Sequence, residues 1–216
     1  MKKILLSLIT LALLLILGAK LTPQLNLFQF EKTSQPSQEI ITRPPLTPEP
    51  KFEFALPVAE FKNRVTKKPF GIFITQKNSP VQPERFSGYH TGVDVEYQDI
   101  ASPVPVFAIC DGEIVFSQWV SGYGGALGLK CQFENQNFYA LYGHLELQSL
   151  TQKIHVKKGD FLANLGENQT QTTDFERKHL HLSLSKNILD FRGYVNQEDK
   201  LSQWHNPEEL LLTKLP

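Results

Sequence analysis

From residue 70 to residue 185 the chain is a succession of short runs of β-forming residues, and this succession limits the possible folds more than any other property. The runs span residues 70–75, 104–110, 112–120, 127–133, 138–145, 161–165 and 179–185. Turn-forming clusters such as Asp111-Gly112 and Lys158-Gly159-Asp160 separate them. Parallel strands need long crossover connections, usually helices, and no helical pattern lies between these runs. We therefore predict an all-β domain of antiparallel strands.

One short helix is expected after the last of these strands, within residues 204–214. Asn206 is a favourable N-cap residue, and Pro207 suits the first helical position. Glu208 and Glu209 follow, where negative charge is favoured by the helix dipole. The domain should therefore end in a short C-terminal helix.

The run at residues 179–185, HLHLSLS, alternates with a period of two. His179, His181, Ser183 and Ser185 fall on one side, and three leucines fall on the other. This pattern predicts a strand whose leucine face lies in the core and whose histidine face is exposed to solvent. Neighbouring residues on one face of a strand are about 6.6 Å apart, so the two imidazoles should lie side by side.

The N-terminus carries an apolar run, residues 4–19, directly after Met1-Lys2-Lys3. Positive charges before an uncharged apolar run are typical of an export signal. The run is short for a membrane-spanning helix of about 20 residues. It is also long for a signal-peptide core, and no clear cleavage site lies near Gly18-Ala19. We predict that residues 1–19 are a signal-anchor in the cytoplasmic membrane, with a cleaved signal peptide as the alternative.

A proline-rich tether is expected to follow the anchor, over residues 20–55. Prolines at positions 23, 36, 44, 45, 48 and 50 exclude a continuous helix or a central strand there. The folded domain should then span residues 56–213. Both a signal-anchor and a cleaved signal peptide place this domain outside the cytoplasm. The anchored protein would remain in the cell envelope, and the cleaved protein would be secreted.

Charge and cysteine content restrict the partners and the redox state. Lys and Arg number 22 and Asp and Glu number 22, so the formal net charge is zero. Nucleic-acid-binding domains usually carry a basic excess, so no nucleic-acid partner is expected. In an exported domain Cys110 and Cys131 can form a disulfide, and two buried thiols are the alternative. Two cysteines without a CxxC pair are a poor structural zinc site.

Three short segments carry histidines that could build a metal site. His90 and Asp94 would lie about 13 Å apart on a straight strand, too far to share one ion. They can share it if the chain bends, most easily at Gly92; an exposed loop is the alternative. His144 follows Gly143 near a strand end, where a structural role is equally ordinary. No HExxH helix is present to supply ligands and a base, so spare imidazoles would have to act as the base.

The three segments in order, HTGVD (90–94), YGHL (142–145) and HLH (179–181), resemble the lysostaphin-type (LytM-like) zinc metallopeptidases of bacterial cell walls. The resemblance extends over residues 69–210 and includes VPVFAICDGEIV (104–115), GYGG (122–125), VKKGDFLANLG (156–166) and WHNPEEL (204–210). It implies an open antiparallel β-fold with a groove over the sheet, one zinc ion per domain and a monomer.

Site residues follow from the resemblance by position. His90, Asp94 and His181 would be the zinc ligands, and His144 and His179 the catalytic pair. The implied reaction is hydrolysis of a peptide bond in the stem peptides or cross-bridges of peptidoglycan. The pattern departs from the family in the charged approach to HLH, residues 166–178, and at Ser183, where many relatives carry Glu. These departures concern substrate preference, because that loop is expected to wall the groove.

Two other functions are compatible with the same fold. One is a non-catalytic envelope adaptor or activator of cell-wall hydrolases, although such members usually lack the ligands. The other is a carrier or sugar-binding module, although a cytoplasmic carrier would not need the export segment. The sequence does not distinguish which bond is cut or which of His144 and His179 is the general base. His155 and His205 match no motif and are interpreted as surface residues.

Overall fold

The computed structural model of the protein describes residues 53–133 and 135–212. The expected signal-anchor and residues 20–52 of the expected tether lie outside these described residues. None of the helices in the described part of the chain has the length and apolar composition of a transmembrane helix.

The described residues form three antiparallel sheets, which confirms the predicted all-β class. The largest is seven-stranded, in the order β12-β10-β7-β6-β5-β8, with β3 also paired to β10. Its strands are β3 (Gly92–Glu96), β5 (Gly112–Val120), β6 (Gly124–Phe133), β7 (Gln136–Leu145), β8 (His155–Val156), β10 (His179–Ser185) and β12 (Trp204–His205). Every named pair in this sheet is antiparallel.

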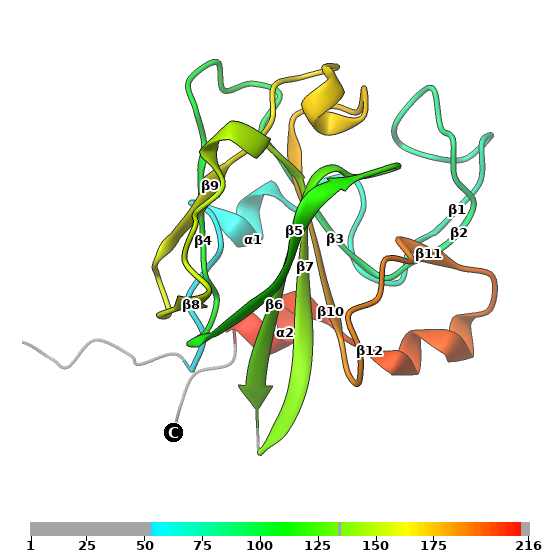
Figure 1. Cartoon of the computed structure of the whole chain (residues 1–216). Coiled ribbons are helices and arrows are strands. Elements are labelled where there is room, and N and C mark those ends of the chain that lie inside the picture. Colours follow the sequence, from blue (N-terminus) through cyan, green and yellow to red (C-terminus); the bar gives the residue numbers. More distant parts are fainter. Residues whose placement is uncertain (1–52, 134, 213–216) are drawn as a thin grey trace, which may run out of the picture. The chain divides into compact units, whose positions relative to one another are not determined.

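Two smaller sheets accompany the large one, one to each side of its long strands in Figure 1. On the right is the sheet of β1 (Phe73–Ile74), β2 (Gly88–His90) and β11 (Tyr194–Val195). On the left β4 (Pro105–Phe107) pairs with β9 (Phe161–Asn164). The helical segments are short: α1 (Phe61–Arg64), α2 (Pro207–Leu212) and the 3-10 turns η1 (Leu147–Ser149), η2 (Gln171–Thr173) and η3 (Glu198–Gln203).

The predicted C-terminal helix is confirmed as α2. Asn206 precedes it, and the Asn206 Oδ1 atom accepts a hydrogen bond of 3.0 Å from the Glu208 amide. Pro207 is the first helical residue, and the acidic pair occupies the first turn. The capping residue and the first turn therefore form the start of this helix, as the sequence predicts.

Strand β10 lies inside the large sheet, flanked by β7 on one side and by β3 and β12 on the other. Its leucines belong to the main core cluster, as predicted. The prediction of a solvent-exposed histidine face is wrong, because all seven residues of β10 are buried. The cause is a second covering layer: the Tyr123 ring packs edge-on against His181, and the guanidinium of Arg177 lies beside the same face.

Two strands in the first motif were not expected from the sequence. The chain runs in β2 within the small sheet, leaves it at Thr91, and enters the large sheet as β3. The bend that the sequence required is thus a change of sheet. Gly92 suits this point because a Cβ atom there would collide with the backbone carbonyl of Leu182 on β10. A glycine is needed for this close approach of two backbones.

Cys110, just before β5, and Cys131 on β6 form a disulfide across 21 positions of sequence. Both side chains are buried in the main core cluster. Among the described residues there is no free cysteine. The bridge therefore ties the entry of β5 to its neighbour strand from inside the core.

Candidate active site

Three side chains bring their donor atoms together at the junction of β2, β3 and β10. The Nδ1 atom of His181 lies 3.0 Å from Oδ1 of Asp94 and 3.2 Å from Nε2 of His90. The third distance, from His90 Nε2 to Asp94 Oδ1, is 3.3 Å. Ligand atoms around one tetrahedral ion at about 2.0–2.1 Å would lie about 3.3–3.4 Å apart. The two imidazoles and the carboxylate therefore match a zinc site in both donor type and spacing.

The sheet geometry explains why these three residues meet. In the pairing of β3 with β10, Asp94 stands directly opposite His181. His90 is the last residue of β2, just before the chain passes to β3, and its Nε2 atom lies 3.3 Å from Oδ1 of Asp94. Side chains directly opposite on an antiparallel pair have Cβ atoms about 4.5–5.5 Å apart, close enough to share an ion. All three are buried, with exposed fractions of 0% for His90, 2% for Asp94 and 4% for His181.

Hydrogen bonds orient the imidazole of His90. Nδ1 of His90 lies 3.1 Å from the carbonyl oxygen of Lys68 and 3.3 Å from that of Pro69. A carbonyl only accepts, so the proton is on Nδ1 and the lone pair of Nε2 faces Asp94 and His181. Lys68 is itself fixed, because its Nζ atom lies 2.7 Å from Oε2 of Glu84 and donates to the Tyr194 hydroxyl at 3.1 Å.

Two further histidines lie next to the three donors. The rings of His144 and His179 are 4.2 Å apart, and both side chains are buried. Nδ1–H of His144 donates to the Thr173 carbonyl at 3.1 Å, and Nδ1–H of His179 donates to the Arg177 carbonyl at 2.8 Å. Each imidazole therefore keeps Nε2 as its unprotonated nitrogen when neutral.

An irregularity in β7 directs His144 toward the site. Its φ is +63°, a left-handed conformation, and it interrupts the alternation of the strand. Tyr142 and Leu145 are three positions apart and would face opposite sides of a regular strand, yet both pack in the main core cluster. His144, between them, turns to the opposite face. Gly143 leaves space for this arrangement, since a Cβ atom there would lie 2.6 Å from Cδ1 of Tyr123.

Burial controls the protonation of these groups. Burial lowers the pKa of His144 to about 3, with Asp94 opposing, and it lowers the pKa of His179 well below its ordinary value. The pKa of His181 is likewise lowered by burial, against the effect of Asp94. For Asp94, burial raises the pKa, but His179, His90 and Arg177 outweigh it, and the pKa lies well below the ordinary value. At neutral pH His144, His179 and His181 are thus neutral and Asp94 is ionised; neutral imidazole and carboxylate are the forms that bind metal.

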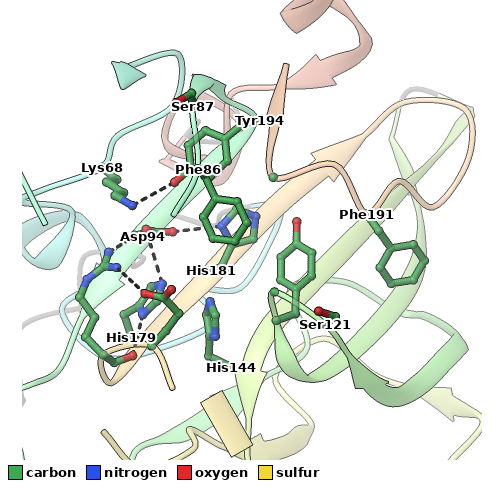
Figure 2. A pocket seen from close by; sticks show the side chains of 15 residues that line it. Lys68, Phe86, Ser87, Asp94, Ser121, His144, His179, His181, Phe191 and Tyr194 are labelled. Carbon is green, nitrogen blue, oxygen red and sulfur yellow. Dashed lines mark hydrogen bonds and ion pairs between the residues drawn. The ribbon is translucent and has the colours of Figure 1, made fainter. Parts of the chain in front are cut away.

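A cleft of about 300 Å³ opens over these groups. Figure 2 shows His144, His179, His181 and Asp94 gathered in it, with Lys68, Phe86 and Tyr194 toward one side and Phe191 toward the other. Glu176 and Arg177, from the charged loop that departs from the family pattern, also line it. The side-chain atoms Tyr123 Oη and His181 Nε2 are buried and have no hydrogen-bond partner among the described residues.

Several residues of the cleft have no predicted role. Tyr123 belongs to the GYGG segment, and Arg177 is one charge among several in the approach loop. Lys68 and Tyr194 lie outside every motif and reach the cleft through the small sheet and its connections. His205, interpreted as a surface residue, is half-buried and lies edge-on to Phe138. His155 is exposed, as expected.

Comparison with known proteins identifies similar domains. Residues 88–192 match peptidase family M23. The structure of the catalytic domain of the antimicrobial peptidase lysostaphin from Staphylococcus simulans is 23% identical over 73% of this chain and 100% of that domain, with a TM-score of 0.50. No curated protein matches the chain.

Two other solved structures are similar at lower TM-scores. The longer lysostaphin structure from Staphylococcus simulans is 23% identical over 72% of this chain and 52% of that chain, with a TM-score of 0.47. Csd3 from Helicobacter pylori is 20% identical over 68% of this chain and 35% of that chain, with a TM-score of 0.42. The likeness to the lysostaphin catalytic domain establishes the fold, which is an open antiparallel β-structure of that kind.

Proposed function

The resemblance to the lysostaphin-type peptidases is confirmed by the match to peptidase family M23, and on this premise we propose that the chain is a zinc-dependent endopeptidase of peptidoglycan. Its substrates would be peptide bonds in the stem peptides or cross-bridges of the cell wall. Proposed ligands are His90, Asp94 and His181, and the proposed catalytic pair is His144 and His179.

One observation carries this proposal. Three donor atoms lie 3.0–3.3 Å from one another, and two neutral imidazoles lie beside them in the same cleft. Three protein ligands leave a position free for water or substrate, which distinguishes a catalytic zinc site from a closed structural one. A structural site alone would give no reason to bury two additional imidazoles next to the ligands.

Each group then has a chemical task. A zinc ion held by the three ligands supplies Lewis acidity toward the scissile carbonyl and toward a water molecule. Nε2 of His144 or His179 accepts the proton of the attacking water, because both Nδ1 atoms are engaged with backbone carbonyls. The other imidazole can bond the developing oxyanion only as the imidazolium, with its second proton on Nε2, because its Nδ1–H is held by a backbone carbonyl. The negative charge of the oxyanion favours that protonation. The aromatic side chains of Phe86, Tyr123 and Tyr194 restrict water around the reacting groups.

The remaining proposals concern the whole chain and rest on its sequence. Residues 1–19 anchor the protein in the cytoplasmic membrane, residues 20–55 are the tether, and the domain acts outside the cytoplasm as a monomer. Disulfide formation between Cys110 and Cys131 is compatible with this compartment.

Zinc content and cell-wall digestion, measured on the purified full chain, test the proposed activity. We expect one zinc ion per chain by elemental analysis and release of peptide fragments from isolated peptidoglycan, identified by mass spectrometry. His181→Ala should lose zinc and activity together, while the surface control His155→Ala keeps both. Stoichiometric zinc in His181→Ala would contradict the ligand assignment. A zinc-loaded wild-type protein that releases no fragment from any peptidoglycan would favour the adaptor function.

A further inference from the structure

Arg177 is buried against the proposed metal site and bonds two carboxylates at once. Its side chain is 5% exposed. Nη2 donates to Oδ2 of Asp94 at 2.7 Å and to Oε1 of Glu96 at 2.7 Å. Nε donates to both oxygens of Glu96, at 3.0 and 2.9 Å. The guanidinium is therefore fixed by Glu96 in a position from which it reaches the ligand Asp94.

Strand register produces this contact. In the β3–β10 pair Asp94 is opposite His181, and Glu96 is opposite His179. Arg177 is two residues before His179, so it continues the same face of β10 beyond the strand end. Residues 177, 179 and 181 are thus on the same face of the sheet as the carboxylates of residues 94 and 96. Lys178, between them, points to the other face, where its Nζ atom lies 3.0 Å from Oε1 of Glu167.

The two oxygens of Asp94 have different surroundings. Oδ1 faces the ligand nitrogens, at 3.0 Å from His181 Nδ1 and 3.3 Å from His90 Nε2. Oδ2 accepts the bond of 2.7 Å from Arg177 and lies 3.5 Å from Nε2 of His179. A carboxylate can bind a metal through one oxygen or through both, and the second mode consumes a coordination position. An arginine bond to Oδ2 favours the first mode.

Arg177 also contacts the proposed catalytic pair through its backbone. Its carbonyl oxygen accepts the Nδ1–H bond of His179. One residue is thereby bonded to a proposed ligand by its side chain and to a proposed catalytic imidazole by its main chain. Since its guanidinium is engaged with Asp94 and Glu96 and almost entirely buried, little of it remains for contact with a substrate.

We propose that Arg177, held by Glu96, is a positioning residue that makes Asp94 a one-oxygen ligand and so keeps the remaining coordination position free. The proposal rests on the zinc function proposed above. It accounts for a basic residue in the approach loop and an acidic residue two positions after the ligand, which form one buried unit. Neighbours that orient metal ligands typically change metal affinity by about 10–100-fold when they are replaced.

The test uses the full chain and two readouts that do not depend on activity: zinc affinity by competition with a chelator, and the visible spectrum of the cobalt-substituted protein. Arg177→Met should change the zinc affinity by about 10–100-fold. The visible absorption bands of its cobalt form should be weaker than those of wild type, as expected for a higher coordination number. Arg177→Lys should lie between Arg177→Met and wild type, because an ammonium keeps the charge but lacks the planar fork that bonds both carboxylates.

Two further variants separate positioning from stability. Arg177→Met leaves Glu96 without its main partner, so the double variant Glu96→Gln/Arg177→Met removes that buried charge and should show the same metal defect. Lys178→Met is the matched control: it removes a buried cation, 1% exposed, from the adjacent position and the opposite face. It should lower the melting temperature but leave zinc affinity and the cobalt spectrum unchanged.

Two results are decisive. Wild-type affinity and spectrum in both Arg177→Met and the double variant would overturn the positioning role while leaving the peptidase function intact. A wild-type chain that binds no zinc would overturn both proposals. If Arg177→Met does not fold, the double variant and Arg177→Lys decide the question by the same two readouts.

Discussion

At the scale of single residues, the site is defined by which nitrogen of each imidazole is free. Backbone carbonyls hold Nδ1–H of His90, His144 and His179, and in each case this leaves Nε2 for chemistry. His181 differs, because its Nδ1 faces Asp94. Backbone contacts, which no motif encodes, thus assign the tautomers on which the proposed roles of ligand and base depend.

The first prediction separates the catalytic pair from the ligands. His144→Ala and His179→Ala should each retain zinc, because neither imidazole is one of the three mutually close donors. Cell-wall hydrolysis should nevertheless fall by about 10²–10⁴-fold, and the double variant should lose less than the product of the two effects. Zinc content and turnover are measured on the same samples, with His155→Ala as control. If His179→Ala lost zinc while His181→Ala kept it, the two roles would be exchanged.

The second prediction concerns acid stability of the metal-free protein. The pKa of His144, His179 and His181 is lowered by burial, so the unfolded chain binds protons below a pH of about 6.5 while the folded chain does not. Stability is therefore fully present above about pH 6.5 and falls as the pH decreases toward the folded pKa of His144, about 3. Each such histidine contributes up to about 1.4 kcal/mol per pH unit.

Urea unfolding in the presence of a chelator, at about pH 7 and about pH 5, measures this dependence. His144→Asn should reduce the loss of stability between the two pH values, and His155→Asn should leave it unchanged. An identical pH dependence in wild type and His144→Asn would show that His144 is not neutral in the folded protein.

At the scale of elements, prediction from sequence succeeded where one periodicity dominates and failed where tertiary contacts decide. Strands β5 and β10 have the predicted bounds, because clear turn signals flank β5 and a strict alternation marks β10. Strand β3 was not predicted, because its alternation of Val93 and Val95 with Asp94 and Glu96 extends over few residues and because Gly92 and Asp94 are poor strand formers. The five proposed site residues came from a family resemblance. Arg177 and Glu96 could not, because their contact depends on the register of β3 against β10.

The third prediction concerns the disulfide between the entry of β5 and β6. Bridging Cys110 and Cys131 across 21 positions should stabilise the domain by about 3 kcal/mol, chiefly by restricting the unfolded chain. Cys110→Ala/Cys131→Ala should therefore unfold at a lower denaturant concentration than wild type, and a reductant should affect only wild type. Alkylation of both thiols in unreduced, unfolded wild-type protein, seen by intact mass, would contradict the bridge.

At the scale of the whole molecule, the chain combines the proposed active-site cleft with an N-terminal segment that, by its composition, should remain in the membrane. A proline-rich tether of residues 20–55 would let the domain reach the cell wall while the anchor stays behind. This arrangement would confine hydrolysis to the wall layer within reach of the membrane.

The fourth prediction tests that arrangement. The full chain should sediment with membranes and keep its N-terminal residues, whereas a variant lacking residues 2–19 should remain in the cytosolic fraction. Cell fractionation and N-terminal peptide mapping give the result. A mature N-terminus beyond residue 19 would establish cleavage and a released protein instead.

The change of sheet at Thr91 affects how the two sheets are held together. It places His90 on the three-stranded sheet, and Asp94 and His181 on the seven-stranded sheet. An ion bound by all three would be a cross-link between the two sheets. Hydrogen exchange in β1, β2 and β11 should therefore slow markedly on adding zinc, while β5 and β6 change little, and His90→Ala should abolish the difference. Equal slowing in all strands would mean that the metal stabilises only the domain as a whole. Slowing confined to the small sheet would mean that the bound ion holds this sheet to the large one.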